Sequence, residues 1–214
     1  MGYNWEYGHC YSTLLFLLNS KMNNLNKQKI EELNFILSKI NYDKNTQFLD
    51  LGCGYGDMSE LLHRAGYKIL GVDKVNALKF NVPFVKSKAE DFDVSQFDVI
   101  ISYGLLEFTE DPIYLLNKLN REMKKDSILL FAVPNVCSLS RRIKCLIGKN
   151  PNRERESVTW DFTFSDIERI LEDNWEGRYE FIITHNIRIK NIKIPTLKNF
   201  SNPIMVICKN DKKI

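Results

Sequence analysis

Several classes of protein are excluded by what this sequence lacks. No apolar run approaches the roughly 20 residues of a membrane-spanning helix, and residues 14–18 lack the basic segment that opens a signal peptide. The five cysteines are scattered without a Cys-x-x-Cys pair, which speaks against a zinc cluster and a disulfide framework. We therefore expect a cytoplasmic protein with no membrane span.

A strong charge of either sign is also lacking. The 214 residues contain 30 Lys and Arg against 27 Asp and Glu, which gives a net charge of +3. So small an excess does not indicate a nucleic-acid partner. The hydrophobic content of 44% is enough to build the core of one domain.

Short apolar runs alternate with helical patterns over the middle of the chain. Asp111 followed by Pro112 is typical of a helix start. Fully apolar strands separated by helices predict a parallel sheet that is covered on both faces. The expected strands are 46–51, 67–72, 82–85, 97–102 and 127–133, and the expected helices are 56–65 and 111–123.

The two ends of the chain differ from the middle. Residues 1–45 carry apolar residues at helical spacing and predict an N-terminal helical cap before a core at 46–214. A basic insert is expected at about 137–163. Further elements follow: a helix at 166–173 opened by a capping box of Ser165 and Glu168, and strands at 179–189 and 203–208.

A glycine loop follows the first expected strand, in the sequence LDLGCGYGD at residues 49–57. Glycines at 52, 54 and 56 let a ligand approach the backbone closely. A dinucleotide fingerprint would need its third glycine at position 57, where Asp57 would repel a pyrophosphate at the start of a helix. A cationic ligand would instead be attracted by Asp50 and Asp57.

A further acid, Asp73, ends the second expected strand. It lies about twenty residues after the glycines, which is the spacing at which a carboxylate accepts hydrogen bonds from ribose hydroxyls. The ligand is then a ribonucleoside with a positive tail and no phosphate at the loop. S-adenosylmethionine meets all of these requirements.

Three stretches in this order resemble the class I S-adenosylmethionine-dependent methyltransferases: FLDLGCGYGDMSELLHRAGYKILGVDK, KAEDFDVSQFDVIISYGLLEFTEDP and KKDSILLFAVPN. The resemblance covers about residues 46–136 well, and the tail with FTFSDIERILEDN more weakly. It implies an α/β fold, with a Rossmann-like seven-stranded mostly parallel sheet and helices on both faces. It also implies S-adenosylmethionine as cofactor and S-adenosylhomocysteine as product.

The resemblance also implies a set of cofactor-binding residues. The methionine part would contact Asp50, Gly52, Cys53, Gly54 and Gly56. The ribose would bind Asp73 beside Lys74, and the adenine would lie against Ala89, Glu90 and Asp91. Ser102 and Tyr103 would face the transferring methyl group.

The sequence departs from the family pattern at two places. Residues 74–81 form a short connection, in which we expect a helix of one turn, and Lys88 stands where an acid is common. In the ubiquinone-type O-methyltransferases, which this segment also resembles, an E-x-x-E-H stretch is linked to a metal. The matching positions here are Gly104, Glu107 and Phe108, so only one ligand remains and we expect no metal.

Candidates for catalysis and acceptor binding each have a plainer structural interpretation. Glu107 is a candidate base or substrate contact, or a buried structural carboxylate, and Tyr103 is a further catalytic candidate. His9, in an aromatic-rich start with Tyr11, could belong to a lid over the cofactor or only pack there. Acceptor-binding candidates are Asn135, Arg141 and Arg142, the two arginines as an anion site or as a solvated face.

These residues predict a methyltransferase acting on O or N of a small acceptor. The acceptor is expected to be anionic or sugar- or phosphate-linked, because the VPNVCSLSRRIKCLIGKNP stretch looks like members that modify small metabolites or surface-glycan (capsule) precursors. An RNA or protein methyltransferase is an alternative, although the [ND]-P-P-[FYW] motif is replaced by Ser102-Tyr103-Gly104-Leu105. A non-catalytic binding protein is another.

Overall fold

The computed structural model describes residues 37, 38, 40, 42–150, 158–182 and 202–211, and the backbone alone of residues 186–189 and 192–195. The expected N-terminal cap at 1–45 lies almost wholly outside the described residues. His9 and Tyr11 also lie outside them.

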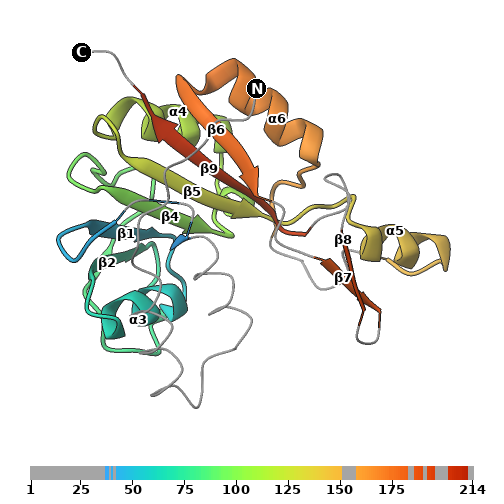
Figure 1. Cartoon of the computed structure of the whole chain (residues 1–214), viewed down its shortest axis with the longest axis horizontal. Helices are drawn as coiled ribbons and strands as arrows, with labels where there is room; N and C mark the ends of the chain where they lie inside the picture. The colour runs from blue at the N-terminus through green and yellow to red at the C-terminus, as the bar shows by residue number, and fades with distance from the viewer. Residues whose placement is uncertain are drawn as a thin grey trace.

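A seven-stranded sheet forms the centre of the molecule, in the order β3-β2-β1-β4-β5-β9-β6 (Figure 1). The first five strands in this order run parallel, and β9 is antiparallel to both of its neighbours. This confirms the expected α/β fold with a mostly parallel sheet. The strands are β1 (Gln47–Leu51), β2 (Lys68–Asp73), β3 (Phe84–Lys86), β4 (Val99–Tyr103), β5 (Ile128–Val133), β6 (Gly177–Ile182) and β9 (Ile204–Asn210).

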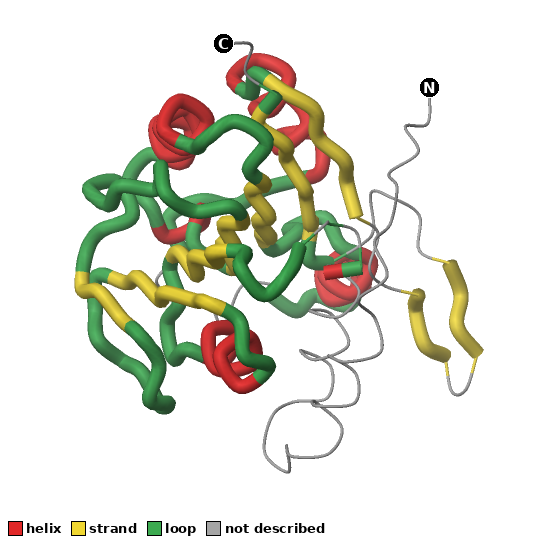
Figure 2. Tube along the Cα trace, turned by 60° about the vertical axis from the view of Figure 1, so that its left-hand side comes forward, coloured by secondary structure: helices red, strands yellow, loops and turns green. Residues whose placement is uncertain are grey.

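Helices cover both faces of the sheet (Figures 1 and 2). On one face, apolar residues of α4 (Pro112–Glu122) and α6 (Phe164–Asn174) share a core with Leu49 and Leu129. On the other face, α3 (Asp57–Arg64) packs into a second core with Phe48. All six residues of β5 are buried, as expected for a strand with a covered face on each side.

The ends of the described helices follow from local capping. The Asp111 carboxylate accepts hydrogen bonds from the backbone N–H groups of Ile113 and Tyr114, so α4 begins where the sequence predicted. The predicted start of α6 was wrong by two residues. Thr163 and Asp166 form the capping box there. The Thr163 hydroxyl accepts a hydrogen bond from the Asp166 N–H, and the Asp166 carboxylate accepts one from the Thr163 N–H.

The strand expected at 179–189 is two strands. β6 ends at Ile182, which pairs with Met205 near the start of β9. β7 (Asn186–Ile189) then pairs with β8 (Ile192–Pro195) in a separate antiparallel ribbon.

The one-turn helix expected within residues 74–81 is also absent from the described structure. Residues 74–83 are irregular there, and the Lys79 N–H donates to the Tyr55 carbonyl outside the segment instead of to a helical neighbour. The amphipathic start of the basic insert forms the helix α5 (Leu139–Leu146). Among the helices that the structure describes, none combines the length and apolar character needed to cross a lipid bilayer.

Candidate functional site

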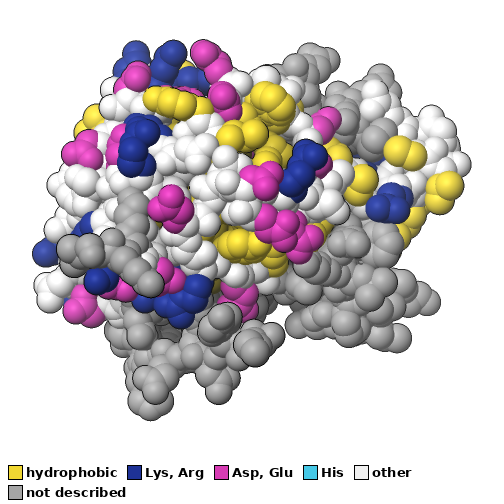
Figure 3. Space-filling model, turned by 90° about the horizontal axis from the view of Figure 1, so that it is seen from above, with side chains coloured by type: hydrophobic (Ala, Val, Ile, Leu, Met, Phe, Trp, Pro, Cys, Tyr) yellow, Lys and Arg dark blue, Asp and Glu magenta, His cyan; other side chains and the backbone are white. Residues whose placement is uncertain are grey.

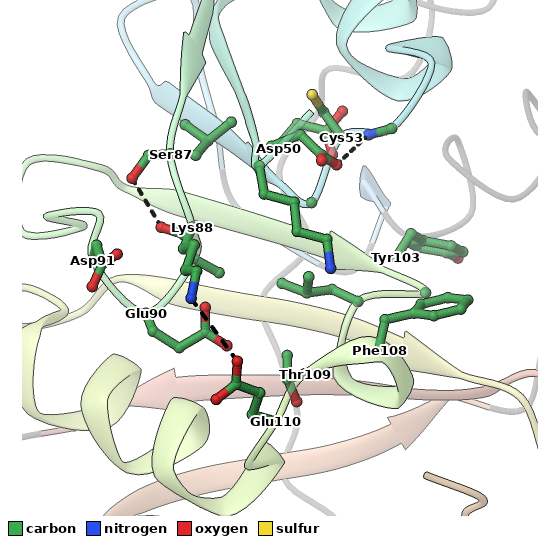
Figure 4. A pocket seen from close by; sticks show the side chains of 18 of the residues that line it. Asp50, Cys53, Ser87, Lys88, Glu90, Asp91, Tyr103, Phe108, Thr109 and Glu110 are labelled. Carbon is green, nitrogen blue, oxygen red and sulfur yellow. Dashed lines mark hydrogen bonds and ion pairs between the residues drawn. The ribbon is translucent and has the colours of Figure 1, made fainter. Parts of the chain in front are cut away.

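A cavity of about 1030 Å³ lies at the carboxyl edge of β1, β2 and β4. Ligands of open parallel sheets bind at this edge, so the cavity is where the fold class predicts a site. Figure 4 shows its labelled residues coming from several separate loops. The lining residues are Asp50, Gly52, Cys53, Gly54, Tyr55, Asp57, Met58, Val72, Asp73, Lys74, Ser87, Lys88, Ala89, Glu90, Asp91, Tyr103, Gly104, Leu105, Phe108, Thr109, Glu110, Asp111, Tyr114 and Thr159.

The three loop glycines all have positive φ, at +79° for Gly52, +52° for Gly54 and +80° for Gly56. L-residues with side chains rarely adopt this conformation. A Cβ at Gly52 would lie 2.9 Å from a Leu105 carbon, and one at Gly56 would lie 2.6 Å from a Leu78 carbon. A Cβ at Gly54 would meet nothing within 4 Å. Gly54 therefore presents bare backbone to open space in the cavity.

The glycine loop is held in place by the end of β2. The backbone N–H groups of Gly52 and Cys53 both donate to the Val72 carbonyl, at 2.8 and 3.1 Å. The Gly54 N–H donates to Asp73 Oδ2 at 2.9 Å. The other oxygen of Asp73 accepts from the Val75 N–H at 3.0 Å. Asp73 thus orders the loop as well as lining the cavity, a second role that its sequence position did not reveal.

Asp50 links the loop to the start of α3. The N-cap residue of this helix is Gly56, which has no side chain with which to cap it. The buried Asp50 carboxylate takes that role by accepting from the Ser59 backbone N–H at 3.1 Å and the Ser59 hydroxyl at 2.6 Å. A negative charge at a helix N-terminus is favourable.

The pKa of Asp50 is raised to about 6, mainly by burial and also by the nearby carboxylates of Asp73 and Asp57, while the Ser59 hydrogen bonds act in the opposite direction. The same surroundings act on the neighbouring thiol. Burial, together with the charges of Asp50 and Asp73, raises the pKa of Cys53 to about 12. Because a thiol with so high a pKa stays protonated, Cys53 is not a nucleophile at neutral pH.

The described wall of the cavity is rich in acids. Seven carboxylates line it, from Asp50, Asp57, Asp73, Glu90, Asp91, Glu110 and Asp111, against the two cations Lys74 and Lys88. Lys88 lies 3.9 Å from the Glu110 carboxylate, an exposed pair that Figure 4 shows beside Glu90. The charge of this wall favours a ligand with positive charge.

The opposite end of the cavity is apolar and aromatic. Tyr103 and Phe108 lie close to each other there, away from Ser87 and Asp91 (Figure 4). Leu105, between them in the sequence, packs against Gly52. The Tyr103 hydroxyl donates to the Met205 sulfur at 3.4 Å, which ties this end of the cavity to β9.

Sequence reasoning missed several lining residues. Leu105, Phe108 and Thr109 directly follow β4, so their proximity to a known edge could have identified them. No sequence pattern indicated that Thr159 would line the cavity. It reaches the cavity because the N–H groups of Thr159 and Trp160 both donate to the Glu107 carbonyl, at 2.9 and 3.1 Å.

Some predicted site residues lie outside the described wall. Ser102 is buried on the opposite side of β4 from Tyr103, because successive strand residues alternate between faces. Gly56 is buried under Leu78, and the Glu107 side chain is only 2% exposed behind η1 (Leu106–Phe108).

The acceptor-binding candidates that the structure describes are also away from this wall. The buried Asn135 accepts a hydrogen bond from the Cys137 N–H, and its own N–H donates to Asn202 Oδ1. Arg141 and Arg142 belong to α5, where Arg142 Nε donates to the Cys137 carbonyl. The described residues contain no group of three His, Cys, Asp or Glu side chains that could hold a metal ion.

A match to a protein family agrees with the fold and the glycine loop. The model of a family described as "Methyltransferase domain" matches residues 19–183. The chain belongs to this family. The methyltransferase resemblance of its three motifs is thereby confirmed.

Curated proteins that are similar to this chain include methyltransferases. A ubiquinone biosynthesis O-methyltransferase of Actinobacillus pleuropneumoniae is 30% identical over 121 residues, which are 48% of this chain and 52% of the relative. The chain thus spans about half the length of the curated relatives it first matches. An uncharacterized protein of Methanocaldococcus jannaschii is 30% identical over 77% of this chain and 76% of its own.

Solved structures support the fold. The crystal structure of a SAM-dependent methyltransferase from Archaeoglobus fulgidus superimposes with a TM-score of 0.59 at 18% sequence identity. The match covers 91% of this chain and 99% of that one.

Proposed function

We propose that this methyltransferase-family chain binds S-adenosylmethionine in the described cavity and transfers its methyl group to a small acceptor. The open backbone at Gly54 carries the proposal. It lies at a positive φ with no atom within 4 Å of a Cβ built there, and its N–H is fixed by Asp73. Ligand atoms can therefore pack directly on the loop, as the resemblance to S-adenosylmethionine sites requires.

The residues of the cavity fit the parts of this cofactor in one direction. Asp73 lines the cavity and would accept from the ribose, and Ala89, Glu90 and Asp91 form the end of the wall proposed for the adenine. The methionine part would lie along Asp50 and the glycine loop, where the carboxylates of Asp50 and Asp57 favour its positive charges.

The aromatic end of the cavity is then the place for the acceptor. Bound in this orientation, the cofactor supplies an electrophilic methyl group for in-line transfer. Tyr103, Leu105 and Phe108 would align the acceptor and exclude water, which are the main contributions a protein makes to such a transfer. Glu107 lies behind this wall, so we assign it a positioning role through its carbonyl bonds to Thr159 and Trp160.

The acceptor proposed is a small molecule with an oxygen or nitrogen nucleophile. An anionic acceptor, such as a sugar- or phosphate-linked precursor of surface polysaccharide (capsule), would need cations near the aromatic end. Among the described lining residues the cations are Lys74 and Lys88, and α5 carries Arg141 and Arg142 outside the wall. A neutral or phenolic acceptor would suit the aromatic side chains of Tyr103 and Phe108 equally well.

The two alternatives from the sequence have less support. For an RNA or protein acceptor, the described wall of the site is rich in acids. These acids would repel the phosphate backbone of a nucleic acid. The presence of Asp50, the open Gly54 and Asp73 together argues against a non-catalytic protein with a degenerate cofactor site.

Calorimetry with S-adenosylmethionine, and separately with NAD, tests the cofactor proposal. We expect a saturable response to the first and none to the second. Binding of NAD alone would overturn the proposal. A panel of phenolic, amine, sugar-linked and phosphorylated acceptors, scored by release of S-adenosylhomocysteine, then tests the acceptor. Cofactor binding without release for any acceptor would favour the binding-protein alternative.

A further inference from the structure

The helix α5 exposes an apolar surface of its own. None of its residues is buried, and the side chains of Ile143, Leu146 and Ile147 at its end are 50%, 86% and 62% exposed. Their spacing of three and four residues places them on one face of the helix. Large aliphatic side chains clustered in this way are a sign of an interaction surface.

Positive charge accompanies this apolar face. Arg141, Arg142, Lys144 and Lys149 lie within or just after α5. The sequence contains no Asp or Glu from residue 127 to residue 153. Cations that surround an apolar helix face, in a segment without acids, are typical of helices that lie in a membrane interface.

The β7–β8 ribbon repeats this combination independently. Its register pairs Ile187 with Ile194 and Ile189 with Ile192, and pairs Arg188 with Lys193 between them. Because successive strand residues alternate between faces, the two isoleucine pairs share one face of the ribbon, and Arg188 and Lys193 belong to the other face. The sequence again contains no Asp or Glu, here from residue 181 to residue 210.

Both elements lie at the same end of the molecule. Figure 1 shows α5 and the β7–β8 ribbon together, projecting beyond the seven-stranded sheet. At that end of Figure 3, hydrophobic side chains and a basic side chain appear together on the surface.

We propose that this end, made of residues 139–149, 186–189 and 192–195, docks on the surface of an anionic lipid bilayer. The cations of α5 would meet the lipid headgroups, while Ile143, Leu146 and Ile147 would enter the boundary of the acyl chains. A second copy of the chain fits less well because like charges would face each other. A nucleic acid would contact the cations but would leave the aliphatic side chains exposed to water.

Sedimentation of the full chain with vesicles tests the proposal. Vesicles of phosphatidylcholine with phosphatidylglycerol should bind the chain, and vesicles of phosphatidylcholine alone should bind it much more weakly. Leu146→Asp should lower the partition coefficient by about tenfold or more, because it removes an apolar contact and adds a negative charge. Ile113→Asp is the matched control, since Ile113 is an aliphatic residue 42% exposed on α4, and it should bind like the unchanged chain.

A charge-reversal pair separates the electrostatic part. Lys144→Glu combined with Lys149→Glu should reduce binding by about tenfold or more, and added salt should reduce binding by the unchanged chain. Lys125→Glu, just before the opposite end of β5, should change little. Equal binding to both vesicle types, or undiminished binding by Leu146→Asp, would overturn the proposal. A dimer in solution that Leu146→Asp abolishes would also overturn the proposal. The same is true of RNA binding that Leu146→Asp abolishes, if the chain does not bind vesicles.

Discussion

The glycine-loop region and the α5 region both contain glycines with positive φ, but the surroundings of these glycines differ. Around Gly52–Gly56, Leu105 and Leu78 pack closely on Gly52 and Gly56, and hydrogen bonds to the buried Asp50 and the half-buried Asp73 order the backbone. At the end of α5, Gly148 also has a positive φ of +70°, but nothing lies within 4 Å of a Cβ built on it. One region has its geometry fixed by tertiary packing, whereas the other depends on local chain preference.

The difference indicates where the molecule can change without loss of its fold. The cavity wall comes from loops that are bonded to one another, so a change at one residue is transmitted to others. The α5 helix has no buried residue, so its opening would disturb few contacts. Substitutions in the two regions should therefore differ in their effect on global stability and on cofactor binding.

The largest contrast is expected between two glycine substitutions. Gly52→Ala would place a Cβ 2.9–3.0 Å from two Leu105 carbons at a φ of +79°, and should lower the free energy of unfolding by about 2–5 kcal/mol. Gly148→Ala has the same backbone cost, but the new Cβ would meet open space. Because α5 can open locally, this variant should lower the free energy of global unfolding by less than about 1 kcal/mol. Urea denaturation measures both. Equal losses would show that packing on Leu105 does not matter.

A second contrast is the pH dependence of stability. Burial raises the pKa of Asp50 from its ordinary value of 3.8 to about 6, so the folded chain retains a proton that the unfolded chain releases. The stability contributed by protonated Asp50 is therefore lost as the pH rises from about 4 to about 6. Over this range Asp50→Asn should gain stability relative to the unchanged chain by up to about 3 kcal/mol.

Asp166→Asn provides the comparison of opposite sign. The Thr163 hydroxyl holds the pKa of Asp166 below its ordinary value of 3.8, so this variant should lose stability relative to the unchanged chain as the pH rises toward about 4, and should show little further change from about pH 4 to about pH 6. Unfolding curves at several pH values would measure both differences. Parallel pH profiles for Asp50→Asn and the unchanged chain would contradict the assignment of Asp50.

A third contrast concerns the affinity for S-adenosylmethionine. Asp73→Ala removes the proposed ribose acceptor and the carboxylate that fixes the Gly54 N–H, and should weaken binding by about 1–3 kcal/mol, roughly 5- to 150-fold. Asp93→Ala is a matched control. Asp93 also accepts from the N–H two residues ahead, at Ser95, but it does not line the cavity. Calorimetry should show unchanged affinity for this control, and a similar loss in both variants would point to a general effect on folding.

The sequence predicted the sheet and the cofactor edge because both depend on local patterns. Buried strands are continuous apolar runs, and Gly52, Gly54 and Gly56 follow the first of them directly. The acid at the end of the next strand has a spacing set by one strand-helix-strand unit. These features need no knowledge of the rest of the chain.

Features that depend on distant partners could not be predicted in the same way. β6 pairs with β9, a strand much later in the chain, and Thr159 lines the cavity because its segment bonds to the Glu107 carbonyl. The capping of α3 by Asp50 joins residues that are nearer in the chain, but it also depends on how the glycine loop folds back. The start of α6 failed for another reason, since two overlapping patterns, Thr163 with Asp166 and Ser165 with Glu168, both resemble a capping box.

These two overlapping patterns provide the smallest and most discriminating test in the carboxyl-terminal region. In the structure, Thr163 caps α6 and Ser165 is an exposed residue within the helix. Thr163→Ala should therefore lower the free energy of unfolding by about 1 kcal/mol, whereas Ser165→Ala should change it by no more than about 0.5 kcal/mol. Neither should alter the affinity for S-adenosylmethionine, because neither side chain lines the cavity. A larger loss from Ser165→Ala would restore the sequence-based start of the helix and would move its first turn by two residues.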